Sequence, residues 1–236
     1  GLGGANYGTD GQVLTSAGAG AAAAWETVAG GLTGKVEGTN FTDSLLVGHS
    51  TTGTLNAAQD NTGVGIDALD ALTSGDNNTA VGSGAGTAIT TGTTNVAIGA
   101  SALMTNSTGN TNTAVGYSAL QDATGTGNVG VGYDAGDNVS SGNYNTCVGR
   151  DSGQNITTGS GNIIIGYVDA AANDSARTLK ITSYDGTTTT NHIIGDSSGN
   201  LTFPADVTLG DDLLLDSDSC VLKFGDDQDV TLTHTD

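Results

Sequence analysis

The sequence predicts an all-β protein: a β-solenoid of about eight 17-residue coils, followed by a β-rich shaft segment. Three observations lead to this fold class. Rows of this length recur through the middle of the chain, every row has Gly at its fifth position, and the position before that Gly is always β-branched. Such a row is too short for a helical repeat pair but long enough for one coil of a β-solenoid.

Residues 1–43 precede the repeat and form a connector rich in Gly and Ala, in which we expect short strands. The single methionine of the chain is Met104, and no basic stretch followed by an apolar run opens the sequence. We therefore expect the chain to be part of a longer protein.

Residues 44–169 hold the repeat. Each row from the second onward starts with Asn, the step from Asn112 to Asn128 is shorter than the others by one, and the first row starts at Ser44. The Asn at the start of these rows suggests a ladder of side-chain amides that are hydrogen-bonded from coil to coil. The Gly supplies the backbone conformations needed at the corners. The residues that define the repeat are Asn61, Gly65, Asn78, Gly82, Asn95, Gly99, Asn112, Gly116, Asn128, Gly132, Asn145, Gly149, Asn162 and Gly166.

Alternation along each row divides its side chains between two faces. The second and fourth residues, such as Thr79 and Val81, point one way, and Asn, Ala and Gly point the other. We expect the β-branched residues to form a thin core, with pairs such as Ala102-Leu103 as the opposite wall. The small-residue face would then be buried against other copies of the chain, which predicts a homotrimer.

Residues 170–236 lose the period of the repeat and become rich in Asp. Apolar residues alternate there in pairs such as Leu201 and Phe203, or Leu222 and Phe224, between Asp and Gly turns. This pattern is typical of half-buried strands. We expect a β shaft segment that continues beyond Asp236.

Composition and charge exclude several classes of protein. The chain has 236 residues with 39 Gly and only 4% aromatic residues, which argues against the thick core of a conventional enzyme. Five Lys and Arg stand against 25 Asp and Glu, giving a net charge of -20. Such a chain cannot neutralise a nucleic acid backbone and is repelled by anionic membranes. Since no apolar run approaches the length of a membrane span, we expect no membrane insertion.

Several segments resemble known families. The sequences NTAVGSGAG (78–86), NVAIGASAL (95–103) and NTAVGYSAL (112–120) are similar to the Asn-x-Ala-Val/Ile-Gly repeats of trimeric autotransporter adhesin heads and of bacteriophage tail fibres. GTDGQVLTSAGAGAAAAW (8–25) and ADVTLGDDLLLDSDSCVLKFGDDQDVTLTH (205–234) resemble tail-fibre segments of marine phages, including cyanophages. The resemblance implies left-handed β-rolls or triangular β-helices that trimerise along a fibre axis.

The function predicted from these features is structural and not enzymatic. We expect a trimeric fibre segment of a phage tail fibre or virion appendage that attaches to a bacterial host. Its partners would be copies of itself, other virion or fibre proteins, and a glycan or protein receptor on the bacterial surface. The alternative is a bacterial surface adhesin or extracellular filament subunit, located at the bacterial cell surface.

A β-helical polysaccharide depolymerase is a third possibility. It requires paired carboxylates that face a groove. Asp67, Asp134 and Asp151 share one position of the row and could supply them. Tyr117, Tyr133 and Tyr167 share the position after the Gly, and could form either a stripe that binds sugars or a packing ladder.

Metal and redox chemistry are weakly indicated. Asp211, Asp212, Asp216 and Asp218 are candidates for Ca²⁺ because hard cations prefer carboxylate oxygens, but their spacing fits no known calcium loop. Aspartates of this kind are more often solvated turn residues than calcium ligands. No cofactor is expected apart from this candidate calcium. Cys147 and Cys220 match no metal spacing and are expected to be buried small side chains. The three histidines, His49, His192 and His234, are isolated.

Overall fold

The computed structural model confirms an all-β chain built around a solenoid. It describes residues 12–15, 24–27, 34–38, 41–47, 56–204 and 207. These residues include no helix. The strands are β1 (Gln12–Thr15), β2 (Ala24–Thr27), β3 (Gly34–Gly38), β4 (Phe41–Val47), β5 (Ala58–Gln59), β6 (Thr62–Val64), β7 (Thr79–Val81), β8 (Val96–Ile98), β9 (Thr113–Val115), β10 (Val129–Val131), β11 (Thr146–Val148), β12 (Ile163–Ile165), β13 (Leu179–Tyr184), β14 (Thr189–Gly195) and β15 (Leu201–Thr202).

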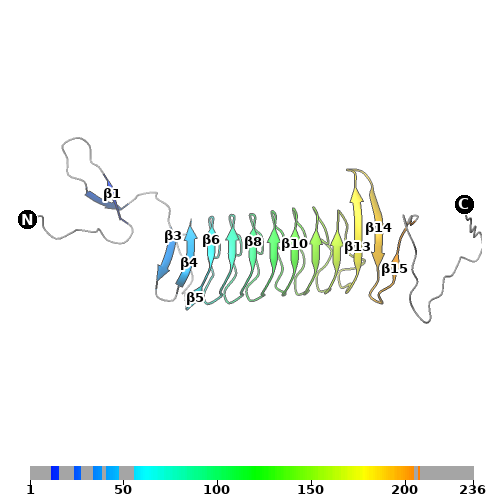
Figure 1. Cartoon of the computed structure of the whole chain (residues 1–236), viewed down its shortest axis with the longest axis horizontal. Coiled ribbons are helices and arrows are strands. Elements are labelled where there is room, and N and C mark those ends of the chain that lie inside the picture. Colours follow the sequence, from blue (N-terminus) through cyan, green and yellow to red (C-terminus); the bar gives the residue numbers. More distant parts are fainter. Residues whose placement is uncertain are drawn as a thin grey trace, which may run out of the picture. The chain divides into compact units, whose positions relative to one another are not determined.

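The solenoid consists of short parallel strands stacked in register, one from each coil. Strands β6 to β12 pair in chain order (Figure 1). Thr79 lies opposite Val96, and Val81 opposite Ile98. Strand β4 adds the row that starts at Ser44, with Leu46 opposite Gly63. The predicted row alignment is therefore the alignment of the coils.

Antiparallel strands flank this parallel stack on both sides. Strand β3 pairs with β4, and β14 pairs with both β13 and β15. Parallel pairing runs on beyond residue 169, because Ile163 lies opposite Leu179 and Ile165 opposite Ile181. The chain divides into two units, residues 1–204 and 205–236. Of the expected shaft segment, the residues from 208 onward lie outside the described part of the chain.

The interior of the coil is the reverse of the one predicted from the sequence. The third residue of each row lies inside: Ala80, Ala97 and Ala114 are buried, whereas Val81 and Ile98 are 38% and 40% exposed. Alternation was identified correctly, but the small-residue face is the core and the β-branched face is the outer surface. The prediction that Ala and Gly are buried against other copies of the chain is therefore wrong.

The narrowness of the coil explains this reversal. The wall opposite the strands carries Leu and Ala side chains, including Leu69, Leu103 and Leu120, all fully buried. At Gly130, an added Cβ would lie 2.7 Å from Cγ of Leu120. Because interiors pack to near-crystalline density, a large residue at Gly130 would overfill the lumen there. Leu46 and Ile164, at the third position of the first and last rows, are the large exceptions and are fully buried. Pairs such as Ala102-Leu103 form the opposite wall as predicted.

The asparagine ladder expected from the sequence runs through the interior. All seven Asn at the start of a row are fully buried. Within the ladder, Oδ1 of Asn78 accepts hydrogen bonds from the backbone N–H (3.0 Å) and from Nδ2 (3.1 Å) of Asn95. The Nδ2 of Asn78 also donates to the carbonyl of Gly92 at 2.9 Å. Thr178 ends the ladder by donating its backbone N–H and its hydroxyl to Oδ1 of Asn162.

Glycine marks the corner after each strand for a steric reason. Gly82 has a φ of +133°, which L-residues rarely adopt, and an added Cβ would lie 2.6 Å from the carbonyl carbon of Gly99 in the next coil. Coils can stack at the strand spacing only if this corner has no side chain.

One buried asparagine lies outside the ladder. Asn106 is fully buried, and neither its Oδ1 nor its Nδ2 has a hydrogen-bond partner. Equivalent rows carry apolar residues at this position, among them Ile89, Val139 and Ile156. A buried amide without a partner is costly, because it has lost its hydrogen bonds to water.

The same substitution at two buried asparagines should therefore have opposite effects. We expect Asn106→Val to raise the free energy of unfolding by about 1–3 kcal/mol, since it removes an unpaired amide. Asn112→Val should lower it by roughly 2–4 kcal/mol, because it leaves the donors and acceptors of neighbouring coils unpaired. Chemical denaturation of both variants measures the two changes, and destabilisation by Asn106→Val would contradict this account.

Candidate functional site

A column of tyrosine and arginine side chains lies at the sixth position of successive rows, directly after the glycine corner. It contains Tyr117, Tyr133, Arg150 and Tyr167, and Tyr184 follows Tyr167 by one further period of the repeat. The four tyrosines are each between 41% and 52% exposed. We call these five residues the aromatic column.

The column consists of two stacked groups. The rings of Tyr117 and Tyr133 stack with their centroids 5.2 Å apart, and Arg150 places its guanidinium carbon 5.5 Å from the centre of the Tyr133 ring. In the second group, the rings of Tyr167 and Tyr184 are 4.5 Å apart and inclined by 19°. Offset stacking and cation–π contacts of this kind stabilise neighbouring side chains.

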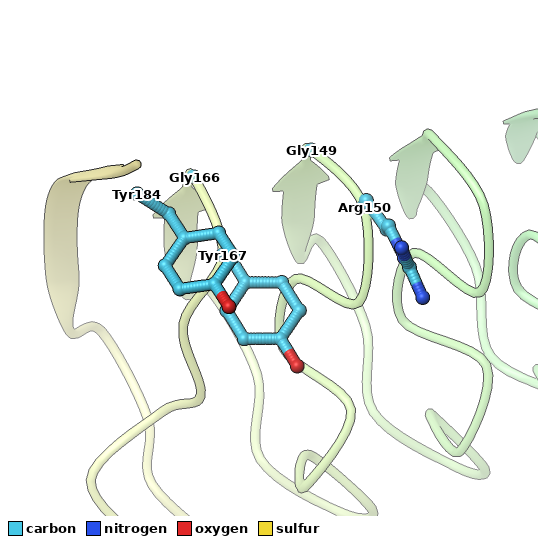
Figure 2. Close-up of a pocket in the computed structure, with 5 residues that line it drawn as sticks. All are labelled: Gly149, Arg150, Gly166, Tyr167 and Tyr184. Carbon is cyan, nitrogen blue, oxygen red and sulfur yellow. The ribbon is translucent and has the colours of Figure 1, made fainter. Parts of the chain in front are cut away.

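A pocket of about 480 Å³ lies where the two groups meet. Its lining consists of Arg150 on one side, Tyr167 and Tyr184 on the other, and Gly149 and Gly166 at the ends of the strands (Figure 2). The two glycines are corner residues, so they contribute no side chain to fill it. The glycine corners therefore leave room at this point, and the sixth-position residues determine both the extent and the chemistry of the pocket.

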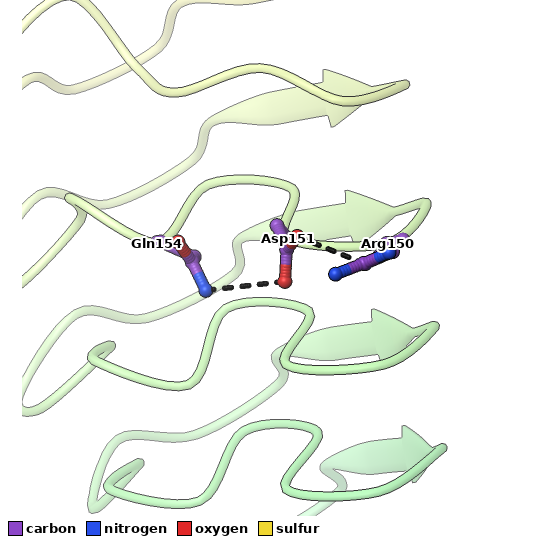
Figure 3. Close-up of polar contacts among 3 residues, drawn as sticks. All are labelled: Arg150, Asp151 and Gln154. Atoms are coloured by element: carbon purple, nitrogen blue, oxygen red, sulfur yellow. Dashed lines mark hydrogen bonds and ion pairs between the residues drawn. The ribbon is translucent and has the colours of Figure 1, made fainter. Parts of the chain in front are cut away.

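An ion pair fixes the arginine at this pocket. The Nε–H of Arg150 donates to Oδ2 of Asp151 at 3.0 Å, and Nε2 of Gln154 donates to Oδ1 of the same carboxylate at 3.4 Å (Figure 3). The Arg150 side chain is 73% exposed, whereas that of Asp151 is only 13% exposed. The carboxylate is thus held against the coil and the guanidinium reaches the surface.

Acidic residues adjoin the column on the side of Tyr133. Burial raises the pKa of Asp134, and the Asp151 carboxylate raises it further. Burial also raises the pKa of Asp137 to about 6, and the nearby Asp134 carboxylate adds to this effect. The charge of Asp134 is the main cause of the raised pKa of Tyr133.

The three aspartates considered for a depolymerase are not all neighbours. Asp134 and Asp151 belong to adjacent coils and interact electrostatically, while Asp67 lies four rows earlier. In the part of the chain that the structure describes, no three His, Cys, Asp or Glu side chains form a group that could hold a metal ion. The calcium candidates Asp211, Asp212, Asp216 and Asp218 lie outside the described residues, so that prediction stays open.

The cysteine and histidine predictions fall partly within the described residues. Cys147 is a buried free thiol at the third position of its row, as expected for a small apolar side chain, and burial raises its pKa to about 12. His192 lies on β14, where its Nε2 is 2.9 Å from the Ser183 hydroxyl. Cys220, His49 and His234 lie outside the described residues.

Sequence reasoning identified the three tyrosines of the repeat but missed Arg150 and Tyr184 as members of the same column. The period of the repeat was the available signal: Arg150 stands at the sixth position of its row, and Tyr184 follows Tyr167 by the same interval. The pocket between Arg150 and Tyr167 depends on the direction in which Arg150 leans, which no spacing reveals.

Comparison with known proteins adds no further assignment. No family model matches the chain, no curated protein matches it, and no solved structure matches it. Over the described residues, no helix is long and apolar enough to cross a membrane.

The raised pKa of Asp137 predicts a pH-dependent contribution to stability. Because the pKa is about 6 in the folded state against an ordinary value of 3.8, the folded chain binds the proton more tightly, and stability falls as the pH rises between these values. We expect Asp137→Asn to raise the melting temperature, and to raise it more at about pH 7.5 than at about pH 4.

The control for this experiment is Asp174→Asn, which removes the same charge at an exposed position. Thermal unfolding followed by circular dichroism measures both variants. An Asp137→Asn effect that is equal at the two pH values, or that is reproduced by Asp174→Asn, would show that the Asp137 environment is not the cause.

Proposed function

We propose that the chain is a non-enzymatic structural protein: a segment of a homotrimeric attachment fibre, extracellular and carried on a virion as part of a tail fibre or related appendage. The observation that carries this proposal is the uncharged outer face of the solenoid strands. The resemblance of several segments to phage tail fibres supports a location on a virion. The alternative is a bacterial surface adhesin or extracellular filament. The partners proposed are copies of the same chain, other virion or fibre proteins, and a receptor on the bacterial surface.

On strands β6 to β12 the outer face is built only from Thr, Val and Ile. Two side chains on each of the strands β6 to β12 point outward, for example Val96 and Ile98 or Ile163 and Ile165. None of them is charged, in a chain with five basic and 25 acidic residues. An extended uncharged face in which Val and Ile outnumber Thr is typical of a surface that contacts another protein.

A second copy of the chain fits this face better than an unrelated protein does. The face repeats once per coil, so another solenoid of the same coil spacing can match it row by row. The net charge of -20 opposes association elsewhere on the surface, which leaves the uncharged face as the one with least repulsion. Closed symmetry would cover this face in every copy, and the resemblance favours three copies.

The proposed self-association uses the face opposite to the one expected from the sequence. Ala and Gly are enclosed within each coil, while the β-branched residues remain available to other chains. Attachment through such a fibre would be mechanical and multivalent, because several weak contacts on one rigid assembly add avidity without catalysis.

Charged substitutions on this face should separate the copies. For the wild-type chain of 23.1 kDa, we expect a native mass of three chains, about 69 kDa, by light scattering after size exclusion. The double variant Val81→Asp/Ile98→Asp should have the mass of one chain, because burying unpaired carboxylates is costly. The control Asn138→Asp adds charge at an exposed residue off this face and should stay trimeric. A wild-type mass of one chain would refute the trimer.

Location on a virion is tested separately. Antibodies raised against the purified chain should label the fibres of phage particles in negative-stain electron microscopy. If the antibodies label bacterial cell surfaces and leave phage particles unlabelled, the adhesin or filament is favoured instead. Pre-absorption of the antibodies with the purified chain provides the specificity control.

A further inference from the structure

We infer that the pocket between Arg150 and Tyr167 binds a sugar ring of a neutral polysaccharide. The proposal stands on the pocket, on the free ring face of Tyr167 and on the polar groups around it. The proposal names the class of receptor. It rests on the proposed function only in the expectation that the polysaccharide lies on a bacterial surface.

The aromatic column is not required by the fold. The sixth position is occupied by Ile66, Ser83 and Ala100 in earlier coils, and these coils have the same strand register and the same glycine corners. The solenoid therefore tolerates small, polar or aliphatic side chains at this position. Packing between coils does not explain why the later coils carry Tyr, Tyr, Arg and Tyr.

The stacking leaves one aromatic face unoccupied. Tyr184 covers one face of the Tyr167 ring, and Arg150 leans toward Tyr133, away from Tyr167. Figure 2 shows the resulting space between the Tyr167 ring and the Arg150 side chain. Its volume of about 480 Å³ falls within the range of roughly 300–1,000 Å³ that is common for small-ligand sites.

The chemistry of the walls suits a pyranose ring. The C–H groups on one face of a sugar carry partial positive charge and pack against the electron-rich face of an aromatic ring. Arg150 offers N–H donors to sugar hydroxyls, and the phenol groups of Tyr167 and Tyr184 both donate and accept. One apolar platform with a few polar groups at its edge is the usual composition of such a pocket.

Electrostatics favour a neutral sugar over an anionic one. The positive charge of Arg150 is paired with Asp151, and Asp134 is nearby, so the pocket offers no uncompensated positive charge to an anion. The net charge of -20 on the chain repels uronic acids and other anionic sugars further.

The pocket remains accessible if the strand faces of several copies pair. Arg150 and Tyr167 lie past the glycine corners, on the segments that leave the strand ends, whereas the proposed trimer contact lies on the strands themselves (Figure 2). A trimer would present three such pockets, which would raise the avidity for a repetitive polysaccharide.

Binding of defined oligosaccharides to the purified chain tests the proposal. The probes are the neutral maltoheptaose, cellohexaose and mannohexaose, with hexagalacturonic acid as the anionic comparison, measured by isothermal titration calorimetry and saturation-transfer NMR. We expect saturable binding of at least one neutral probe, with saturation transferred from the tyrosine ring protons to the sugar C–H protons. Binding of the anionic probe should be at least tenfold weaker.

Variants at equivalent repeat positions provide matched controls. Tyr167→Ser and Arg150→Ala place in the pocket the residues that other coils carry at this position, so both should fold, and we expect Tyr167→Ser to weaken binding at least tenfold. Tyr144→Ser removes an exposed tyrosine outside the column and should leave the affinity unchanged. Circular dichroism confirms the fold of each variant.

Three outcomes would overturn the inference: no saturable binding of any neutral probe, unchanged binding in Tyr167→Ser, or preference for the anionic probe. These results are separate from those that test the proposed function. A trimer that binds no neutral probe would refute only the sugar site, and a single chain that binds one would refute only the fibre.

Discussion

The narrow lumen of the coil is the constraint on which the rest of the structure depends. Most coils have room for an Asn and a small residue from the strand side, and for Leu or Ala from the opposite wall. A buried side-chain amide is tolerated there because it is hydrogen-bonded to neighbouring groups. The Nδ2 of Asn95, for example, donates to Oδ1 of Asn78 and to the carbonyl of Gly109. The ladder therefore fixes the register of the coils, and the register in turn aligns every other column of side chains, including the aromatic one.

The sequence allowed the period, the strands, the corners and the ladder to be predicted, because each depends on spacing within one row. It did not allow the inside to be distinguished from the outside. Alternation separates Ala80 from Val81 but does not say which of them is buried, and the usual preference for β-branched cores pointed the wrong way. The physical signal was volume: most third positions hold Gly, Ala or Cys, and at Gly130 an added Cβ would collide with Leu120 of the opposite wall.

The candidate site was predictable in part for the same reason. Tyr117, Tyr133 and Tyr167 share a row position, so their alignment followed from the period, and Tyr184 follows Tyr167 by one more period. The pocket did not follow, because it arises where Arg150 turns toward one neighbour and leaves the other uncovered. The rotamer of Arg150 depends on its neighbours: Asp151 accepts a hydrogen bond from the guanidinium, and Gln154 donates one to the Asp151 carboxylate.

The direction of the hydrogen bonds has a mechanical consequence for a rod of this kind. Strand pairing and the asparagine ladder both link one coil to the next, so these bonds lie along the stacking direction. Each coil contacts only its neighbours, and a pull along the stack therefore loads all the coil interfaces in series. Tensile strength is then set by the weakest interface, and additional coils lengthen the rod without strengthening it. Bundling solenoids side by side makes them share the load in parallel, so the strength of the assembly grows with the number of chains in cross-section.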